Sequence, residues 1–302
     1  MTPEATSSIA AMKFAINYGT AFYGVDPDNL LAYARHAEAC GFEGLYLPEH
    51  IVLYPGAALG VHELPPTLPL ADPLECLSFV AAATSRILLG TGVLLLPYRH
   101  PVVLAKQLAT IDVLSKGRMR LLTVGLGSLP GEAQAVGVDY ASRGRRADEA
   151  IDVLRLLWAG GEDGVSFHGE FFDFDHLVSF PKPVGGGPLP IHIGGSSRAA
   201  ARRAGLRGDG YFPGGMLGPD ERNAQLELAR AGRDGFEYTR WGSIEMGMDR
   251  VEAFAAQGVT RMVVQPSSTD LQEQCDQMSA FAERFKLGSD ASTSQPAGAS
   301  GP

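Results

Sequence analysis

Glu49 and His50 form a pair of side chains that could carry acid–base chemistry. The pair follows a short apolar run, residues 44–47, and comes directly after Pro48. Imidazole groups titrate near pH ~6.5, so they can donate or accept a proton, or orient a substrate, at physiological pH. A packed histidine that hydrogen-bonds to Glu49 or to backbone is the alternative interpretation.

Two glycines, Gly90 and Gly92, interrupt a second apolar run at residues 87–95. Glycine inside a central strand weakens the strand and typically marks a bulge or a place where a ligand approaches the backbone closely. A tight corner of the sheet is the alternative. We therefore treat this run as a candidate for direct contact between backbone and ligand.

The tripeptide Gly194-Gly195-Ser196 lies between a predicted strand, residues 189–193, and a predicted helix, residues 197–206. Glycines let backbone N–H groups approach a ligand, and a helix N-terminus carries a partial positive charge. The pattern favours a site for an anion such as a phosphate. A simple turn is the alternative.

Eight short apolar runs, each followed by a helical pattern, must position these residues. Runs of this length bounded by glycine, proline or charged residues are typical of buried parallel strands. Asp72-Pro73 illustrates the helix starts, with an N-cap residue followed by proline in the first turn. The strands are predicted at residues 14–17, 44–47, 87–95, 119–125, 189–193, 210–212, 242–246 and 261–264, and the helices at 28–40, 73–83, 102–114, 142–158, 197–206, 219–231, 249–256 and 271–285.

This alternation predicts an α/β fold with a parallel sheet surrounded by helices. Eight repeats in about 270 residues favour a closed (β/α)8 TIM barrel over an open sheet. A dinucleotide-binding sheet needs Gly-x-Gly-x-x-Gly after an early strand, and the nearest run, residues 125–131, has the wrong spacing. We expect one domain at residues 13–287, with flexible termini at 1–12 and 288–302.

Two connections are too long to be simple loops, residues 48–71 and 160–188. The second alternates apolar and polar residues around His168-Gly169, as a hairpin does. Long insertions in a barrel usually lie at the C-terminal rim, where they enclose a substrate pocket. We expect both insertions at that rim.

The composition narrows the possible partners. The chain has 302 residues with 25 Lys+Arg and 34 Asp+Glu, a formal net charge of −9, which argues against nucleic acid or an anionic membrane as partner. No apolar run is long enough to span a membrane and no secretion signal is evident, so we expect a cytoplasmic protein. The three cysteines lack metal-ligand spacing, so we expect reduced thiols and no metal site.

Six motifs, taken in their order along the chain, resemble the bacterial luciferase-like superfamily, and within it the deazaflavin (coenzyme F420) dependent oxidoreductases of actinobacteria. The resemblance covers about residues 13–265. Its motifs include Pro48-Glu49-His50 and Gly90-Thr-Gly92-Val93, and they lie within residues 39–50, 87–127, 146–158 and 190–210.

The resemblance implies a TIM-barrel enzyme that exchanges a hydride between C5 of F420 and a small organic substrate. It places the family's non-prolyl cis peptide at Gly92-Val93, against one face of the cofactor ring. It places His50, with Glu49, beside the reactive carbon.

The same resemblance assigns cofactor contacts on two further strands. The cofactor phosphate is expected at Gly194, Gly195 and Ser196. The ring or its ribityl chain is expected along the end of the fourth strand, at Gly125, Leu126, Gly127 and Ser128. A homodimer is expected by analogy with the family.

One position departs from the best-known F420-dependent sugar-phosphate dehydrogenases. They carry a glutamate where this chain has Ser128, and the loop that we expect around Pro130 gives no reason to align Glu132 with it. The departure puts a sugar-phosphate substrate in doubt and leaves the proton donor beyond His50 unassigned. Two alternatives stay open: an FMN-dependent monooxygenase that uses O2, and a non-catalytic relative that binds a cofactor or none.

Overall fold

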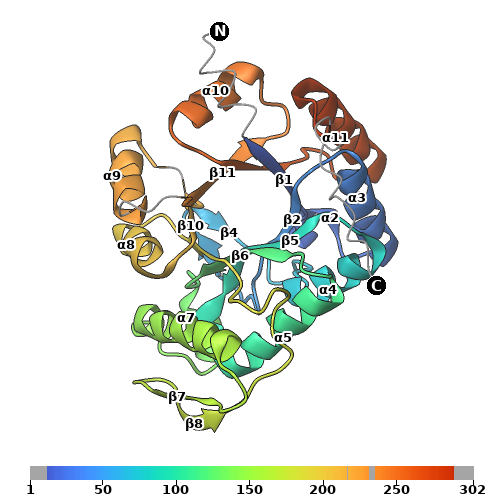
Figure 1. Ribbon diagram of the computed structural model, residues 1–302. Helices are drawn as coiled ribbons and strands as arrows, with labels where there is room; N and C mark the ends of the chain where they lie inside the picture. Colours follow the sequence, from blue (N-terminus) through green and yellow to red (C-terminus); the bar gives the residue numbers. More distant parts are fainter. Residues whose placement is uncertain (1–11, 216, 231–234, 289–302) are drawn as a thin grey trace, which may run out of the picture.

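The computed structural model describes residues 12–215, 217–230 and 235–288. Eight parallel strands close into a barrel in the order β1-β12-β11-β10-β9-β6-β5-β2, which confirms the predicted TIM barrel (Figure 1). The barrel strands are β1 (Lys13–Asn17), β2 (Gly44–Leu47), β5 (Leu88–Leu95), β6 (Met119–Gly125), β9 (Ile191–Gly194), β10 (Gly210–Phe212), β11 (Glu237–Ser243) and β12 (Arg261–Gln265).

Helices surround the barrel on the outside (Figure 1). The cap expected at Asp72-Pro73 is present: Oδ1 of Asp72 accepts from the backbone N–H groups of Leu74 and Glu75. The long helices are α3 (Pro27–Ala39), α4 (Pro73–Ala83), α5 (Pro101–Leu114), α7 (Arg143–Ala159), α8 (Arg198–Arg207), α9 (Pro219–Arg230), α10 (Met248–Ala256) and α11 (Leu271–Phe285), and the short ones are α2 (Thr20–Tyr23), η1 (Leu96–Tyr98) and α6 (Pro130–Ala135).

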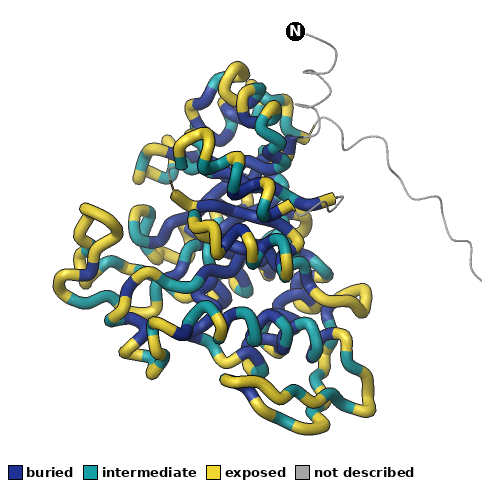
Figure 2. Tube along the Cα trace, turned by 90° about the vertical axis from the view of Figure 1, so that its left-hand side faces the viewer, coloured by how far each residue is buried: buried dark blue, intermediate teal, exposed yellow. Residues whose placement is uncertain are grey.

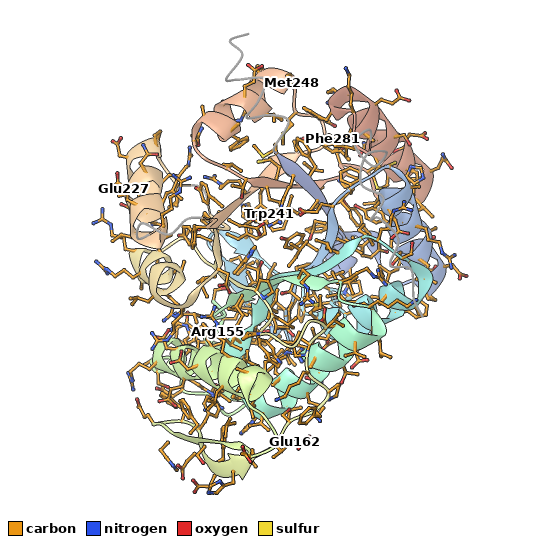
Figure 3. All side chains as sticks on the ribbon, in the orientation of Figure 1. Arg155, Glu162, Glu227, Trp241, Met248 and Phe281 are labelled. Carbon is orange, nitrogen blue, oxygen red and sulfur yellow. The ribbon has the colours of Figure 1, made fainter. Side chains whose placement is uncertain are left out.

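The core has an outer layer between strands and helices and a smaller cluster inside the barrel. Figure 2 shows the buried residues running through the interior, with exposed residues on the loops and outer surfaces. The inner cluster contains Tyr46, Leu121 and Phe212, with Trp241 packed against it. Trp241 lies within the ring of strands in Figure 3. The inner cluster therefore fills the barrel beneath its C-terminal rim.

Gly90 is required by packing inside the barrel. A Cβ atom on Gly90 would lie 2.7 Å from Cβ of Leu121 and 2.9 Å from its carbonyl oxygen. At Gly92, two residues along β5, the nearest atom would be Cδ1 of Tyr46 at 3.4 Å. The two glycines of this strand thus differ: packing explains Gly90, whereas Gly92 borders a pocket at the rim.

The prediction for the seventh barrel strand was wrong. The strand was expected at residues 242–246, but β11 runs from Glu237 to Ser243. The segment contains the charged residues Glu237 and Arg240, and its sequence therefore resembles a loop, because central strands of a parallel sheet are usually apolar runs.

The stretch after β6 was expected to be a loop because it contains Pro130, and that expectation was also wrong. Residues Pro130–Ala135 form the helix α6, with the proline in its first turn. Proline suits this position because a helix leaves the first N–H groups unpaired. The helix buries Glu132 completely.

Only one of the two insertions lies where it was expected. Residues 48–71, with the small β3–β4 hairpin (Ala58–Leu59 and His62–Glu63), contribute to a pocket at the C-terminal rim. The second insertion does form the predicted hairpin, β7 (Val165–His168) with β8 (Asp173–Leu177). It follows α7 and precedes β9, however, and lies outside α7 (Figure 1).

The second insertion is therefore not a rim loop. Chain that follows a barrel helix starts at the N-terminal end of the strands, which explains the error. Among the described residues, no helix is long and apolar enough to cross a membrane. The expected flexible termini lie outside the described residues, except for Met12, which is buried, and Gly288.

Candidate active site

An apolar pocket of ≈ 290 Å³ opens where five barrel strands end. Asn17 closes β1, Gly92 lies in β5, Trp241 in β11 and Gln265 closes β12, while His50 follows β2. The C-terminal ends of barrel strands are where the active sites of TIM-barrel enzymes lie.

The outer wall of this pocket is aliphatic. Leu59, Leu64, Leu68 and Leu70 come from the first insertion, and Phe22 from α2 lies beside them. Phe22 is 66% exposed, although it is large and apolar. A wall of this composition favours an apolar ligand over a sugar or a phosphate ester.

His50 is held at the edge of the pocket by a buried carboxylate. Its Nδ1 lies 3.2 Å from Oε2 of Glu132, and Oε1 of Glu132 accepts from the backbone N–H of Ile51 at 2.5 Å. With a proton on Nδ1, the imidazole donates to this carboxylate, which leaves Nε2 for a ligand. The arrangement fixes both the orientation of the ring and its tautomer.

Glu132 is the site residue that the sequence analysis missed. It was set aside because Pro130 suggested a loop, yet α6 brings its carboxylate to a histidine 82 positions away in the chain. Proline at the first helical position was the available signal. The structure thus brings a carboxylate to His50 even though Ser128 replaces the expected glutamate.

The carboxylate of Glu49 is bound to structural groups. Glu49 accepts from the backbone N–H of Leu95 at 2.5 Å and forms an ion pair with Arg99, which also pairs with Asp72 at 2.6 Å. Burial raises the pKa of Glu49, although Arg99 opposes the shift. Glu49 therefore ties the end of β2 to the end of β5 and to the start of α4.

Gly92-Val93 is a cis peptide, as the resemblance implied. The register between β5 and β6 shifts here, with Gly92 opposite Thr123 and Leu94 opposite Val124, so Val93 forms a bulge. A Cβ atom on Gly125 would lie 2.5 Å from Val93, and one on Gly194 would collide with the same side chain. The Val93 side chain packs against Gly125 of β6 and Gly194 of β9, where these strands lack side chains. Three residues predicted to contact the cofactor therefore lie together.

The remaining predicted residues on the fourth strand lie farther along the rim. Gly127 has φ +76°, and a side chain there would collide with the ring of Tyr98. Leu126 packs against the outer core, and the carbonyl of the exposed Ser128 accepts from Oη of Tyr140 at 3.2 Å. Local packing and turn geometry account for these positions.

The Gly194-Gly195-Ser196 turn connects to the next rim loop. Gly195 has φ +102°, a conformation that favours glycine. Oγ of Ser196 accepts from the N–H of Gly215 at 2.5 Å, and Oγ of Ser197 caps α8 by accepting from Ala200 at 3.1 Å. The N–H groups of Gly195 and Ser196 donate to no described group, which suits an anion.

A larger pocket of ≈ 650 Å³ lies at the opposite, N-terminal end of the barrel. Its charges pair with one another: Arg261 binds Glu43 and Glu237, each at 2.6 Å. Burial acts to raise the pKa of Glu237, but hydrogen bonds from His192 and Arg261 outweigh burial and lower the pKa. Stability rather than chemistry is the usual task of this end of a TIM barrel. Among the described residues no cluster could hold a metal ion.

The lining of the rim pocket would suit a flavin or deazaflavin ring. Such a ring is flat and apolar on its faces and polar at its edge. Trp241 and Gly92 supply apolar surface, and Oδ1 of the buried Asn17 lacks a hydrogen-bond partner among the described residues. A buried acceptor without a partner is costly, and a donor on the edge of a ring would remove that cost.

Comparison with known proteins identifies a family that matches most of the chain. A model of the luciferase-like monooxygenase family matches residues 11–285. An uncharacterized protein of Mycobacterium tuberculosis is 33% identical over 236 residues, which cover 76% of this chain and 79% of that protein.

Two relatives with assigned activities match over a shorter stretch. An F420-dependent hydroxymycolic acid dehydrogenase of M. tuberculosis is 35% identical over 61% of this chain, and an F420-dependent glucose-6-phosphate dehydrogenase of Beutenbergia cavernae is 36% identical over 62%. The matches span 48% and 52%, about half, of these two proteins.

Solved structures share the fold at low sequence identity. An F420-dependent secondary alcohol dehydrogenase has a TM-score of 0.72 at 18% identity, covering 92% of this chain and 99% of that one. Monooxygenase RslO1 of Streptomyces bottropensis has a TM-score of 0.67 at 22% identity, covering 90% and 98%. The barrel, its rim pocket and the family match over residues 11–285 lead to one conclusion: the chain belongs to the luciferase-like monooxygenase family.

Proposed function

We propose that this protein is an F420-dependent oxidoreductase that transfers a hydride between the deazaflavin and a small apolar substrate. The observation that carries the proposal is the rim pocket, in which His50, held by Glu132, borders a space lined by Gly92 and Trp241. The F420-dependent relatives support the choice of cofactor.

In this proposal, F420 supplies the hydride acceptor or donor at its C5 carbon. Nε2 of His50 takes the hydroxyl proton of an alcohol substrate, or returns it to a carbonyl in the reverse direction. Glu132 and Glu49 act as positioning residues, since their carboxylates are bound to His50 and Ile51, and to Leu95 and Arg99. Gly195 and Ser196 would hold the cofactor phosphate through their backbone N–H groups.

The wall of the pocket defines the substrate class. Four leucines from the first insertion surround the opening, and together with Phe22 they would exclude water from the reacting groups. An apolar secondary alcohol or ketone fits this wall. The wall offers no charged partner for a sugar phosphate.

The proposal is tested by turnover without oxygen. Purified protein is mixed with oxidised F420 and a panel of apolar secondary alcohols, and loss of the visible absorbance of the oxidised cofactor is followed. We expect turnover with at least one alcohol, and a fall of about 10²–10⁴-fold in His50→Ala with cofactor affinity retained. Turnover that is unchanged in His50→Ala would remove this histidine from the mechanism.

A second candidate is an FMN-dependent monooxygenase on the same barrel; it is favoured by the match to the luciferase-like monooxygenase family and by the shared fold of a Baeyer-Villiger monooxygenase solved in complex with FMN. Oxygen consumption with reduced FMN, together with no turnover of F420, would support it. A non-catalytic relative is the third candidate. The His50–Glu132 pair speaks against it, because a carrier protein has no need for an oriented histidine.

A further inference from the structure

A second pocket at the rim is lined by three arginines. It has a volume of ≈ 490 Å³ and lies between α9 and α10, with Arg222 on α9, Arg240 on β11 and Arg250 on α10. The glycines of the loop after β10, Gly214 and Gly215, line its other side. Figure 1 shows α9 and α10 as neighbours around the barrel, with β11 on their inner side.

None of the three arginines forms an ion pair with a carboxylate among residues 12–215, 217–230 and 235–288. This contrasts with nearby Arg198, which pairs with Glu221 at 2.8 Å. The chain carries a net charge of −9, so acidic partners are plentiful. Three unpaired arginines around one cavity are therefore a local excess of positive charge.

Arg240 is the most informative of the three because it is only 9% exposed. Its Nη1 donates to Oη of Tyr238 at 3.1 Å, and that neutral hydroxyl is the one hydrogen-bond acceptor that the described residues offer it. A buried cation without a counter-charge is costly. An anion in the pocket would remove this cost.

Arg222 and Arg250 complete the surroundings. Arg222 donates to Oε1 of Gln257 at 2.9 Å and to the carbonyl of Leu217 at 2.7 Å, while its Nε is buried and has no partner among the described residues. The guanidinium groups of Arg240 and Arg250 lie 5.9 and 4.7 Å from the ring centre of Phe254. The three side chains thus converge on one space.

The pocket adjoins the proposed active site. Trp241 lines both pockets, and Gly215 donates to Ser196 in the turn after β9. We propose that the Arg222–Arg240–Arg250 pocket binds an oxyanion, a carboxylate or phosphate group, on a ligand whose other part occupies the apolar pocket. Guanidinium groups suit this task because they bind oxyanions through paired N–H donors.

The first arm of the test needs no cofactor. Calorimetric titration with inorganic pyrophosphate compares the unaltered chain with the double variant Arg222→Gln/Arg240→Gln and with Arg202→Gln. The last variant removes the same kind of charge from an exposed position on α8. We expect Kd to rise at least about 10-fold in the double variant and to stay unchanged in Arg202→Gln.

Equal pyrophosphate affinity in the unaltered chain and the double variant, or no binding to the unaltered chain, overturns the proposal. If the double variant does not fold, Arg250→Gln replaces it, because Arg250 is exposed and its loss leaves no buried group unpaired. The expected result for that variant is a weaker but measurable rise in Kd.

The second arm identifies the source of the oxyanion and rests on the proposed function. F420 with its glutamate tail and F420 lacking the glutamates are titrated into both proteins. A tail in this pocket gives tighter binding of the tailed form, and the double variant loses that difference. Equal binding of both forms excludes the tail and leaves a substrate oxyanion, which would correct the apolar substrate class proposed above. Failure of F420 to bind refutes the proposed function and leaves the pyrophosphate result standing.

Discussion

Replacing Glu132 by glutamine should move the proton of the neutral His50 ring from Nδ1 to Nε2. The glutamine oxygen can still accept from the N–H of Ile51, which binds Oε1 at 2.5 Å. The amide nitrogen then faces Nδ1 at the position where Oε2 lies 3.2 Å away. An amide nitrogen only donates, so Nδ1 must accept and the ring proton must reside on Nε2.

The expected magnitude follows from the single hydrogen bond between His50 and the Glu132 carboxylate. One charge-assisted hydrogen bond contributes about 1.5–3 kcal/mol, so turnover should fall roughly 10–150-fold if the tautomer matters for proton transfer. The free energy of unfolding should fall by only about 1 kcal/mol, because the glutamine keeps one partner and replaces the other. Glu132→Ala should cost about 1–3 kcal/mol more, since it leaves the buried N–H of Ile51 unpaired.

The assay is ¹⁵N NMR of histidine-labelled protein at about pH 8.5, where neutral rings dominate. Long-range ¹H–¹⁵N correlations distinguish the two tautomers, and His50→Gln assigns the signals by removing them. We expect the Nδ1–H form in the unaltered protein and the Nε2–H form in Glu132→Gln. The same tautomer in both proteins would refute the reasoning, as would a His50 ring that is mobile in the unaltered chain.

Three further predictions test other parts of the structure. Glu49→Ala leaves Arg99 and the N–H of Leu95 without their buried acceptor, so urea denaturation should show that the free energy of unfolding falls by roughly 3 kcal/mol. A fall below about 1 kcal/mol would show that these contacts of Glu49 are not needed for stability. Gly90→Ala should destabilise the fold by about 1–3 kcal/mol through its contact with Leu121, whereas Gly92→Ala should fold normally and weaken cofactor binding at least about 10-fold. Burial acts to raise the pKa of Glu237 in the folded state, but hydrogen bonds outweigh it and lower the pKa. The ionised carboxylate therefore stabilises the fold above pH 4.5, and this contribution is lost as the pH falls below that value. Denaturation at several acidic pH values should therefore give a shallower loss of stability in Glu237→Gln than in the unaltered chain, and parallel losses would contradict this.

The barrel could be predicted from the sequence because its signals are local. Caps such as Asp72-Pro73 and short apolar strands recur along the chain, and eight repeats close a barrel. The signals failed where the chain contradicts local preferences. Arg240 and Glu237 lie in a central strand, and Pro130 begins a helix instead of a loop.

The site was predicted only in part for a related reason. Gly92, Val93, Gly125 and Gly194 were expected near the cofactor, and the structure brings them together around the Val93 side chain. The partner of His50 was missed because Glu132 is 82 residues away and no local pattern links the two. The second insertion was misplaced although a predicted helix, residues 142–158, precedes it and a predicted strand, residues 189–193, follows it, an order that places it at the N-terminal end of the barrel.

The central claim is that the rim pocket binds a deazaflavin, and equilibrium titration of the purified protein with F420 and FMN tests it most directly. Fluorescence of each cofactor is followed against protein concentration at fixed salt. The account predicts one F420 bound per chain, at least about tenfold more tightly than FMN. Tight binding of FMN, with no binding of F420 at the same concentrations, would contradict it.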